Sequence, residues 1–147
     1  MPGPAQNDAS MADRAAIQDV ITTYSQHASR GDWDTVLSLF LPEAVWDIPH
    51  LGMHLDGREA IAAALSGFMA HMDYVLQLNA PALVRVTGDS AVATSGIREH
   101  GKSKGVDEGF EYLGLYEDAL ERTAQGWKFR TRVFRQIGTH FTPLRPG

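Results

Sequence analysis

The chain has 147 residues, 44% of them hydrophobic and 21% charged, which is typical of one globular domain and excludes a disordered or fibrous chain. The formal net charge of -5, with only 13 scattered Lys and Arg residues, excludes the basic surface that nucleic-acid binding requires. The absence of cysteine excludes disulfides, thiolate metal ligands and cysteine nucleophiles.

The two ends of the chain are expected to be tails. Residues 1–11 are polar and flexible, residues 12–140 form the predicted single domain, and residues 141–147 follow it. Met11 is an alternative start of the natural chain. The N-terminal segment has neither a secretion signal nor the ~20 apolar residues of a membrane span, so we expect no membrane contact, and the cytoplasm is the default location.

Three helices are predicted in the first half of the chain. From Asp13 onward, apolar residues recur at steps of three and four until Gly31, where glycine can end a helix. Asp32 can cap a second helix that carries apolar residues up to Phe40. Residues 61–72 repeat the helical spacing after an acidic first turn.

Strands are predicted for the remainder. A short β-prone run at residues 44–48 precedes a loop at 52–57. After the third helix, five runs have strand character, with turn residues between them and a charged, glycine-rich loop at 101–109; these runs are residues 73–78, 83–87, 91–99, 110–120 and 127–137. Helices followed by a largely antiparallel sheet predict an α+β domain.

Four segments carry a resemblance to a known family. They are YSQHASRGDWDTVLSLF at 24–40, PEAVWD at 42–47, DGREAI at 56–61 and GWKF at 126–129. Together they resemble the SnoaL-like, ketosteroid isomerase-like family of the nuclear transport factor 2-like superfamily, with scytalone dehydratase and hexachlorocyclohexane dehydrochlorinase among its relatives. The resemblance implies a cone-shaped, curved, mostly antiparallel sheet with three helices in the N-terminal half.

The resemblance also implies cofactor-free proton transfer on an apolar ring compound, as an isomerase, dehydratase or cyclase. Tyr24 matches the tyrosine that donates a hydrogen bond to a substrate oxygen. Asp47 lies beside Ile48, which matches the ketosteroid isomerase base, and a one-residue offset in a strand turns a side chain away unless a bulge intervenes. His71 is a third candidate, since it precedes the family's histidine position by four residues.

The family's acid–histidine dyad is missing from this sequence. Its two positions are occupied by Ser29 and Val75, neither of which moves a proton efficiently at neutral pH. The sequence therefore leaves an alternative open, in which the protein binds a hydrophobic metabolite without catalysis.

A substrate-anchoring arginine is expected on the last predicted strand. Alternation places Arg135 on the same face as Trp127 and Phe129, which should point into the cone. A buried ion pair with Glu111 or Glu99 is the structural alternative. The full expected substrate-binding set is Arg135, Ser29, Val75, Trp46, Phe68 and Glu111.

The expected partners are a small apolar ring ligand and a second copy of the chain. Residues 110–119 are apolar on both faces, so one face should line the pocket and the other should meet a homodimer partner. His50 and His54 have a four-residue spacing, but Pro49 and Gly52 break the helix that would align them. We expect no metal and no cofactor.

Overall fold

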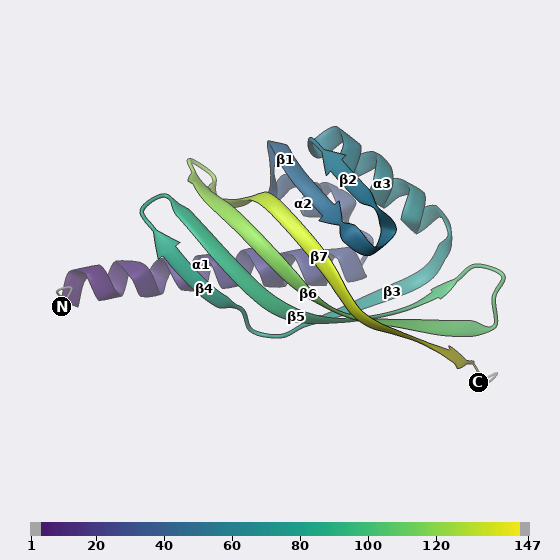
Figure 1. Ribbon diagram of the computed structural model, residues 1–147. Coiled ribbons are helices and arrows are strands. Elements are labelled where there is room, and N and C mark those ends of the chain that lie inside the picture. The colour runs from purple at the N-terminus through teal and green to yellow at the C-terminus, as the bar shows by residue number, and fades with distance from the viewer. Residues whose placement is uncertain (1–3, 145–147) are drawn as a thin grey trace.

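The structure, a computed structural model, describes residues 4–144, with side chains from Ser10 onward. Three helices, α1 (Pro4–Ser29), α2 (Trp33–Ser38) and α3 (Arg58–Ala70), cover one side of a curved sheet (Figure 1). The sheet contains β1 (Phe40–Ile48), β2 (Met53–Asp56), β3 (Met72–Asn79), β4 (Leu83–Thr87), β5 (Ser90–Ser103), β6 (Glu108–Thr123) and β7 (Gly126–Pro143). A short 3-10 helix, η1 (Pro49–Leu51), joins β1 to β2.

The seven strands follow the order β2-β1-β7-β6-β5-β3, and β4 pairs with the other part of β5. Every pairing is antiparallel except that between β1 and β7. The long strands β5, β6 and β7 bend around the helices without closing into a barrel (Figure 1). The architecture is therefore the α+β cone that the sequence predicts.

Helix α1 lies in the hollow of the sheet because its apolar residues repeat with the helical period. Ile17 and Ile21 are fully buried, and Tyr24 and Ala28 continue the same stripe. Asp32 caps α2 by accepting a hydrogen bond from the backbone N–H of Thr35 over 3.2 Å. This cap fixes the sharp turn after α1 and thereby the position of Tyr24 over the sheet.

Several element boundaries differ from the prediction. The second helix ends at Ser38, and Phe40 already belongs to β1. Residues 53–56, expected in a loop, form β2 because they pair with β1 in continuous register. The loop expected at 101–109 is only a short turn, since Gly101 belongs to β5 and lies beneath the ring of Phe110. A Cβ at position 101 would lie 2.2 Å from Phe110 Cζ, so this glycine serves packing inside the sheet.

The ends of the domain also differ from the expected tails. Helix α1 begins at Pro4, within the segment predicted to be flexible, and β7 continues to Pro143. Residues 1–3 and 145–147 of the expected tails lie outside the described residues. Within residues 4–144, no helix combines the length and apolar character needed to cross a membrane.

Candidate functional site

A cavity of about 180 Å³ lies between the inner face of the sheet and the three helices. Its wall is mostly aromatic and aliphatic, with contributions from every helix and from five strands. The lining residues are Tyr24, Trp33, Trp46, Ile48, His50, Leu51, Leu65, Phe68, Met69, Met72, Val75, Gln77, Glu99, Tyr112, Tyr116 and Phe134. This composition is typical of a small-molecule site, in which a few polar groups orient an apolar ligand.

The polar end of the cavity is built around Glu99. Strands β3 and β5 place Gln77 directly opposite Glu99, and Gln77 Nε2 donates a hydrogen bond to Glu99 Oε2 over 2.7 Å. Burial raises the pKa of Glu99 above its usual range, and the hydrogen bond from Gln77 opposes that rise. The cavity therefore holds a carboxyl group whose environment favours proton uptake.

Three tyrosines share this end of the cavity with Glu99. Tyr24 of α1 and Tyr116 of β6 meet edge to face, with ring centroids 6.0 Å apart. Burial is the largest cause that raises the pKa of Tyr24, of Tyr112 and, most strongly, of Tyr116, and the Glu99 charge adds to each rise. The phenols therefore remain protonated at neutral pH, as donors of hydrogen bonds.

Two further polar atoms at the cavity wall have no hydrogen-bond partner among the described residues. They are Trp46 Nε1, a donor, and Gln77 Oε1, an acceptor. Buried polar atoms of this kind are uncommon in folded proteins and call for a physical explanation. Both belong to residues that line the cavity.

A buried ion pair lies behind the tyrosines. Arg132 of β7 and Asp118 of β6 face each other in register, with Nε and Oδ1 3.1 Å apart and both side chains fully buried. The guanidinium carbon lies 4.1 Å from the ring centroid of Tyr24 and 3.6 Å from that of Tyr116. Neither charged group lines the cavity itself.

Four of the predicted site residues line this cavity. Tyr24, Trp46, Phe68 and Val75 do so from α1, β1, α3 and β3, respectively. Trp46 points inward with 6% exposure, and its neighbour Asp47 in β1 therefore points the other way. These placements describe geometry only, and the roles assigned to these residues stay predictions.

Ser29 lies beside the cavity without lining it. Its hydroxyl donates to the carbonyl of Ser25 and accepts a hydrogen bond from the backbone N–H of Gln77, each over 2.8 Å. These bonds attach the end of α1 to β3. The position that holds a carboxylate in the family's dyad is thus occupied here by a link between two elements.

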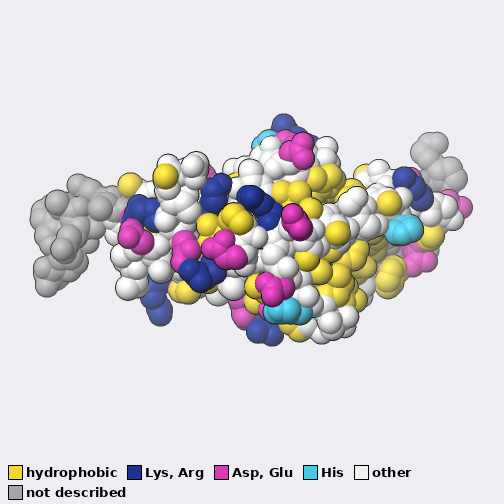
Figure 2. All heavy atoms as spheres, turned by 90° about the horizontal axis from the view of Figure 1, so that it is seen from above, with side chains coloured by type: hydrophobic (Ala, Val, Ile, Leu, Met, Phe, Trp, Pro, Cys, Tyr) yellow, Lys and Arg dark blue, Asp and Glu magenta, His cyan; other side chains and the backbone are white. Residues whose placement is uncertain are grey.

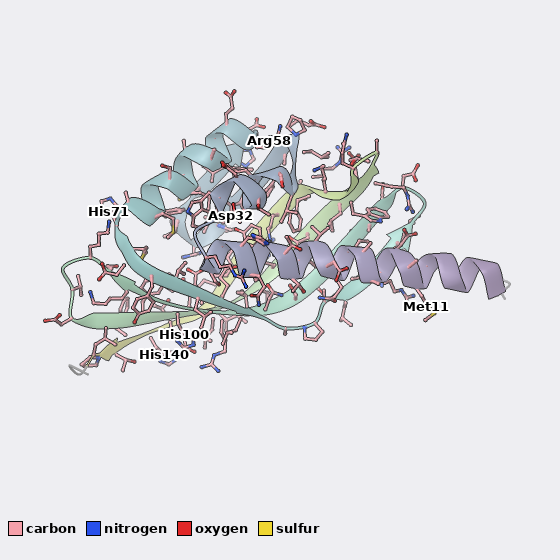
Figure 3. The ribbon with its side chains drawn as sticks, turned by 180° about the vertical axis from the view of Figure 1, so that it is seen from behind. Met11, Asp32, Arg58, His71, His100 and His140 are labelled. Atoms are coloured by element: carbon pink, nitrogen blue, oxygen red, sulfur yellow. The ribbon has the colours of Figure 1, made fainter. Side chains whose placement is uncertain are left out.

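Three other predicted residues lie outside the cavity. Asp47 pairs with His54 of the neighbouring strand β2. His71 is exposed at the end of α3, at the margin of the fold (Figure 3). Glu111 forms ion pairs with Arg98 and His100 of β5, so it belongs to the outer face of the sheet.

Arg135 also lies outside, and the prediction that it enters the cone is wrong. Its side chain is 52% exposed and pairs with Glu117 over 2.9 Å. The cause is a β-bulge, because Thr131 pairs with Ala119 whereas Phe129 pairs with Leu120, which leaves Arg130 as an extra residue. This extra residue reverses the alternation, and Arg132 rather than Arg135 points inward.

The sequence contains a signal for Glu99 that the prediction did not use. Ala91, Ala93, Ser95 and Ile97 are all buried, and strand alternation places Glu99 on their side of β5. Tyr112 and Tyr116 lie in the same way on one face of β6. His50 also lines the cavity, where its ring packs against Phe134 at a centroid distance of 5.8 Å.

The surface over α3 and β2 is mixed in character. In Figure 2, hydrophobic atoms gather near the middle of this side, whereas Lys, Arg, Asp and Glu are interspersed toward the N-terminal end. The face seen in this view carries no continuous block of one charge among the described residues.

A curved, open sheet wrapped around three helices, with an aromatic cavity at their junction, defines an α+β cone of the nuclear transport factor 2-like type. Residues 9–133 match the SnoaL-like domain, and the chain belongs to this family. No curated protein matches the chain at a significant level.

Solved structures agree on the fold. A protein of Novosphingobium aromaticivorans DSM 12444, provisionally named a scytalone dehydratase, superposes with a TM-score of 0.86 at 20% identity, covering 96% of this chain and 95% of that one. Hexachlorocyclohexane dehydrochlorinase LinA-type3 of Novosphingobium barchaimii LL02 gives 0.80 at 19% identity, with 94% of each chain covered. An NTF2-like protein with a cystatin-like fold from Novosphingobium aromaticivorans gives 0.76 at 24%, covering 90% and 87%.

Proposed function

We propose that the protein is a cofactor-independent enzyme that transfers a proton on a small, uncharged ring compound, as an isomerase, dehydratase or cyclase. The observation that carries this proposal is the presence of Glu99 in a cavity that three tyrosines also line. A base that shares an apolar pocket with hydrogen-bond donors is the arrangement that enolisation requires. Dehydratase and dehydrochlorinase names among proteins of the same fold support this class of reaction.

In the proposed reaction, the Glu99 carboxylate removes a proton from a carbon next to a ring carbonyl. The electron pair of the broken C–H bond forms an enolate, whose oxygen accepts hydrogen bonds from Tyr24 and Tyr116. An isomerisation ends when Glu99 returns the proton to another carbon. In a dehydration, the enolate expels a hydroxyl group from the β-carbon, and this group takes the proton from Glu99 and leaves as water.

The raised pKa of Glu99 supports its role as the base, because a carboxylate with a raised pKa binds a proton more strongly than an exposed one. The neutral phenols favour the enolate, since donors aimed at a developing oxyanion lower the barrier. In this proposal, the tyrosine on α1 has the role that the resemblance implies. The base, in contrast, lies on β5 and at neither of the family positions.

The size and charge of the cavity limit the ligand. At about 180 Å³ it is somewhat larger than the roughly 150 Å³ cavity known to hold benzene, so one ring with substituents or a small pair of rings fits. Glu99 and His50 are the ionisable lining residues other than tyrosine, and no Lys or Arg lies among the described lining residues. An uncharged ligand avoids placing an anion next to Glu99.

Deuterium exchange tests this proposal without knowledge of the natural substrate. The protein is incubated with 2-tetralone in D₂O, and mass spectrometry follows deuterium uptake at the α-carbon above the buffer rate. We expect catalysed exchange that Glu99→Gln abolishes and that Glu117→Gln preserves, since Glu117 lies on the outer face beside Arg135. Exchange that continues unchanged in Glu99→Gln would rule Glu99 out as the base.

A binding protein without catalysis is the second candidate. It is favoured by the residues at the two dyad positions, because Ser29 is engaged in backbone hydrogen bonds and Val75 lines the cavity with an aliphatic side chain. Trp33 and Trp46 provide the readout, since quenching of their fluorescence by 2-naphthol reports occupancy. Saturable quenching together with no exchange above the buffer rate would favour this candidate.

A further inference from the structure

The Arg132–Asp118 pair is the one fully buried ion pair among the described residues, and the reaction proposed above does not use it. Its geometry is unusual, because none of the three guanidinium nitrogens and neither Asp118 oxygen makes an aligned hydrogen bond within the described structure. The cation instead contacts aromatic faces, at 3.6 Å from the Tyr116 centroid, 4.1 Å from Tyr24 and 4.5 Å from Phe129. Packing alone does not explain such an arrangement.

Buried ion pairs are expensive structural elements. Desolvation of both charges consumes most of their mutual attraction, and replacement by apolar residues of similar volume is often neutral or stabilising. Two aliphatic side chains at positions 118 and 132 would therefore be expected to give a fold of similar stability. The charge itself calls for a role, and its neighbours indicate where to look.

Those neighbours are the two tyrosines that line the cavity. Arg132 lies behind their rings, on the side away from the ligand space, so it does not reach a ligand directly. A cation at a phenol ring face attracts electron density from the ring and makes the hydroxyl a stronger hydrogen-bond donor. Asp118, paired with Arg132, partly cancels this effect.

We propose that the Arg132–Asp118 pair sets the hydrogen-bond donor strength of Tyr24 and Tyr116 toward the ligand oxygen, with Arg132 as a positioning residue. The proposal rests on the proposed function in one respect, namely that these hydroxyl groups contact a ligand oxygen. The charges act in the corresponding directions on the two phenols, since Arg132 lowers the pKa of Tyr24 and of Tyr116 while Asp118 raises both, against the larger effect of burial.

The test measures donor strength directly, through the carbonyl stretching frequency of bound 1-indanone labelled with ¹³C at the carbonyl. A stronger hydrogen bond to the carbonyl oxygen lowers this frequency. We expect Asp118→Asn, which keeps the cation and removes the opposing charge, to lower the frequency below that of the wild type. The double variant Arg132→Met with Asp118→Leu removes both charges and keeps the volume, and it should raise the frequency.

The matched control is the neighbouring pair on the same two strands. Arg135→Met with Glu117→Leu removes an exposed arginine–glutamate pair and should leave the frequency unchanged. Equal frequencies in the wild type, Asp118→Asn and the double variant, with 1-indanone bound in each, would overturn the proposal. If the double variant does not fold, the Asp118→Asn comparison decides alone.

Two other measurements separate failure of this inference from failure of the proposed function. If Tyr24→Phe and Tyr116→Phe leave the frequency of bound 1-indanone at the wild-type value, the ligand oxygen does not contact these hydroxyl groups. That outcome overturns both proposals at their shared step. By contrast, if the wild type does not catalyse deuterium exchange on 2-tetralone, the proposed catalytic function fails, whereas the frequency measurement can still support this inference.

Discussion

Gln77 and Glu99 face each other across β3 and β5, and the amide of Gln77 donates to the Glu99 carboxyl group over 2.7 Å. The backbone N–H of Gln77 is itself held by the Ser29 hydroxyl of α1. A short chain of hydrogen bonds thus runs from the end of the first helix to the carboxyl group in the cavity. The helix that supplies Tyr24 also fixes the orientation of the proposed base.

Replacement of Gln77 by Leu is expected to move the acid limb of the pH–rate profile to higher pH. The Gln77 hydrogen bond stabilises the Glu99 carboxylate and lowers its pKa, against the larger opposite effect of burial. Without that bond the pKa rises further, and a higher pH is needed to form the carboxylate that removes the proton. The profile of kcat/KM for deuterium exchange measures this shift.

The control for Gln77→Leu is Gln125→Leu in the exposed turn between β6 and β7, which should leave the profile unchanged. A profile of Gln77→Leu that coincides with the wild type, or moves to lower pH, would show that Glu99 does not control the acid limb.

Ser29→Ala is expected to destabilise the fold by about 1 to 2 kcal/mol, because the backbone N–H of Gln77 loses its partner and α1 loses its link to β3. Urea unfolding of wild type and variant measures the loss. Ser38→Ala removes an exposed hydroxyl that bonds only the preceding turn and should cost less than about 0.5 kcal/mol. A Ser29→Ala protein of wild-type stability with weakened 2-naphthol binding would instead make Ser29 a ligand contact.

The sequence predicted the fold well because helix periodicity and turn residues are local signals. The stripe of Ile17, Ile21 and Tyr24 is sufficient to place α1 against the sheet, and the face of β1 follows from Trp46. These features depend on a handful of neighbouring residues. The four cavity-lining residues that were predicted all come from such segments.

The site was predicted less well because strand faces depend on register. In β7 one extra residue at Arg130 turns Arg132 inward and Arg135 outward, and a bulge of this kind has no distinct sequence signal. Glu99 was considered only as an ion-pair partner, because the strand was taken to end there, whereas β5 continues to Ser103. The expected homodimer stays a prediction that sedimentation would test.

Asp118 should make stability depend on pH in the direction opposite to that of an ordinary paired carboxylate. Burial raises the pKa of Asp118 to about 6, although Arg132 opposes the rise, whereas the unfolded chain has a pKa near 3.8. Between these values the folded protein keeps a proton that the unfolded chain has released. The free energy of unfolding therefore falls as pH rises through this window, by up to about 3 kcal/mol.

Urea unfolding of the wild type and of Asp118→Asn, from about pH 4 to about pH 7, isolates this contribution because every other carboxyl group is common to both proteins. As pH rises, the unfolding free energy of Asp118→Asn should increase relative to that of the wild type. Parallel curves would mean that Arg132 holds Asp118 ionised throughout the window.

The affinity of the cavity for a ligand should depend on the charge of the ligand. Three compounds share one ring system, namely 2-naphthol, 2-naphthoate and 2-naphthylmethylammonium, and quenching of Trp33 and Trp46 reports their binding. At a pH where Glu99 is ionised, the naphthoate should bind at least about tenfold more weakly than the naphthol, because like charges repel strongly in a low-dielectric cavity that has no Lys or Arg among its described lining residues. Glu99→Gln should remove most of this difference, since the amide carries no charge, whereas Glu117→Gln on the outer face should retain it. Preference for the ammonium compound over the naphthol would assign the aromatic wall and Glu99 to recognition of a cation, and equal affinity for all three would show that Glu99 does not face the ligand.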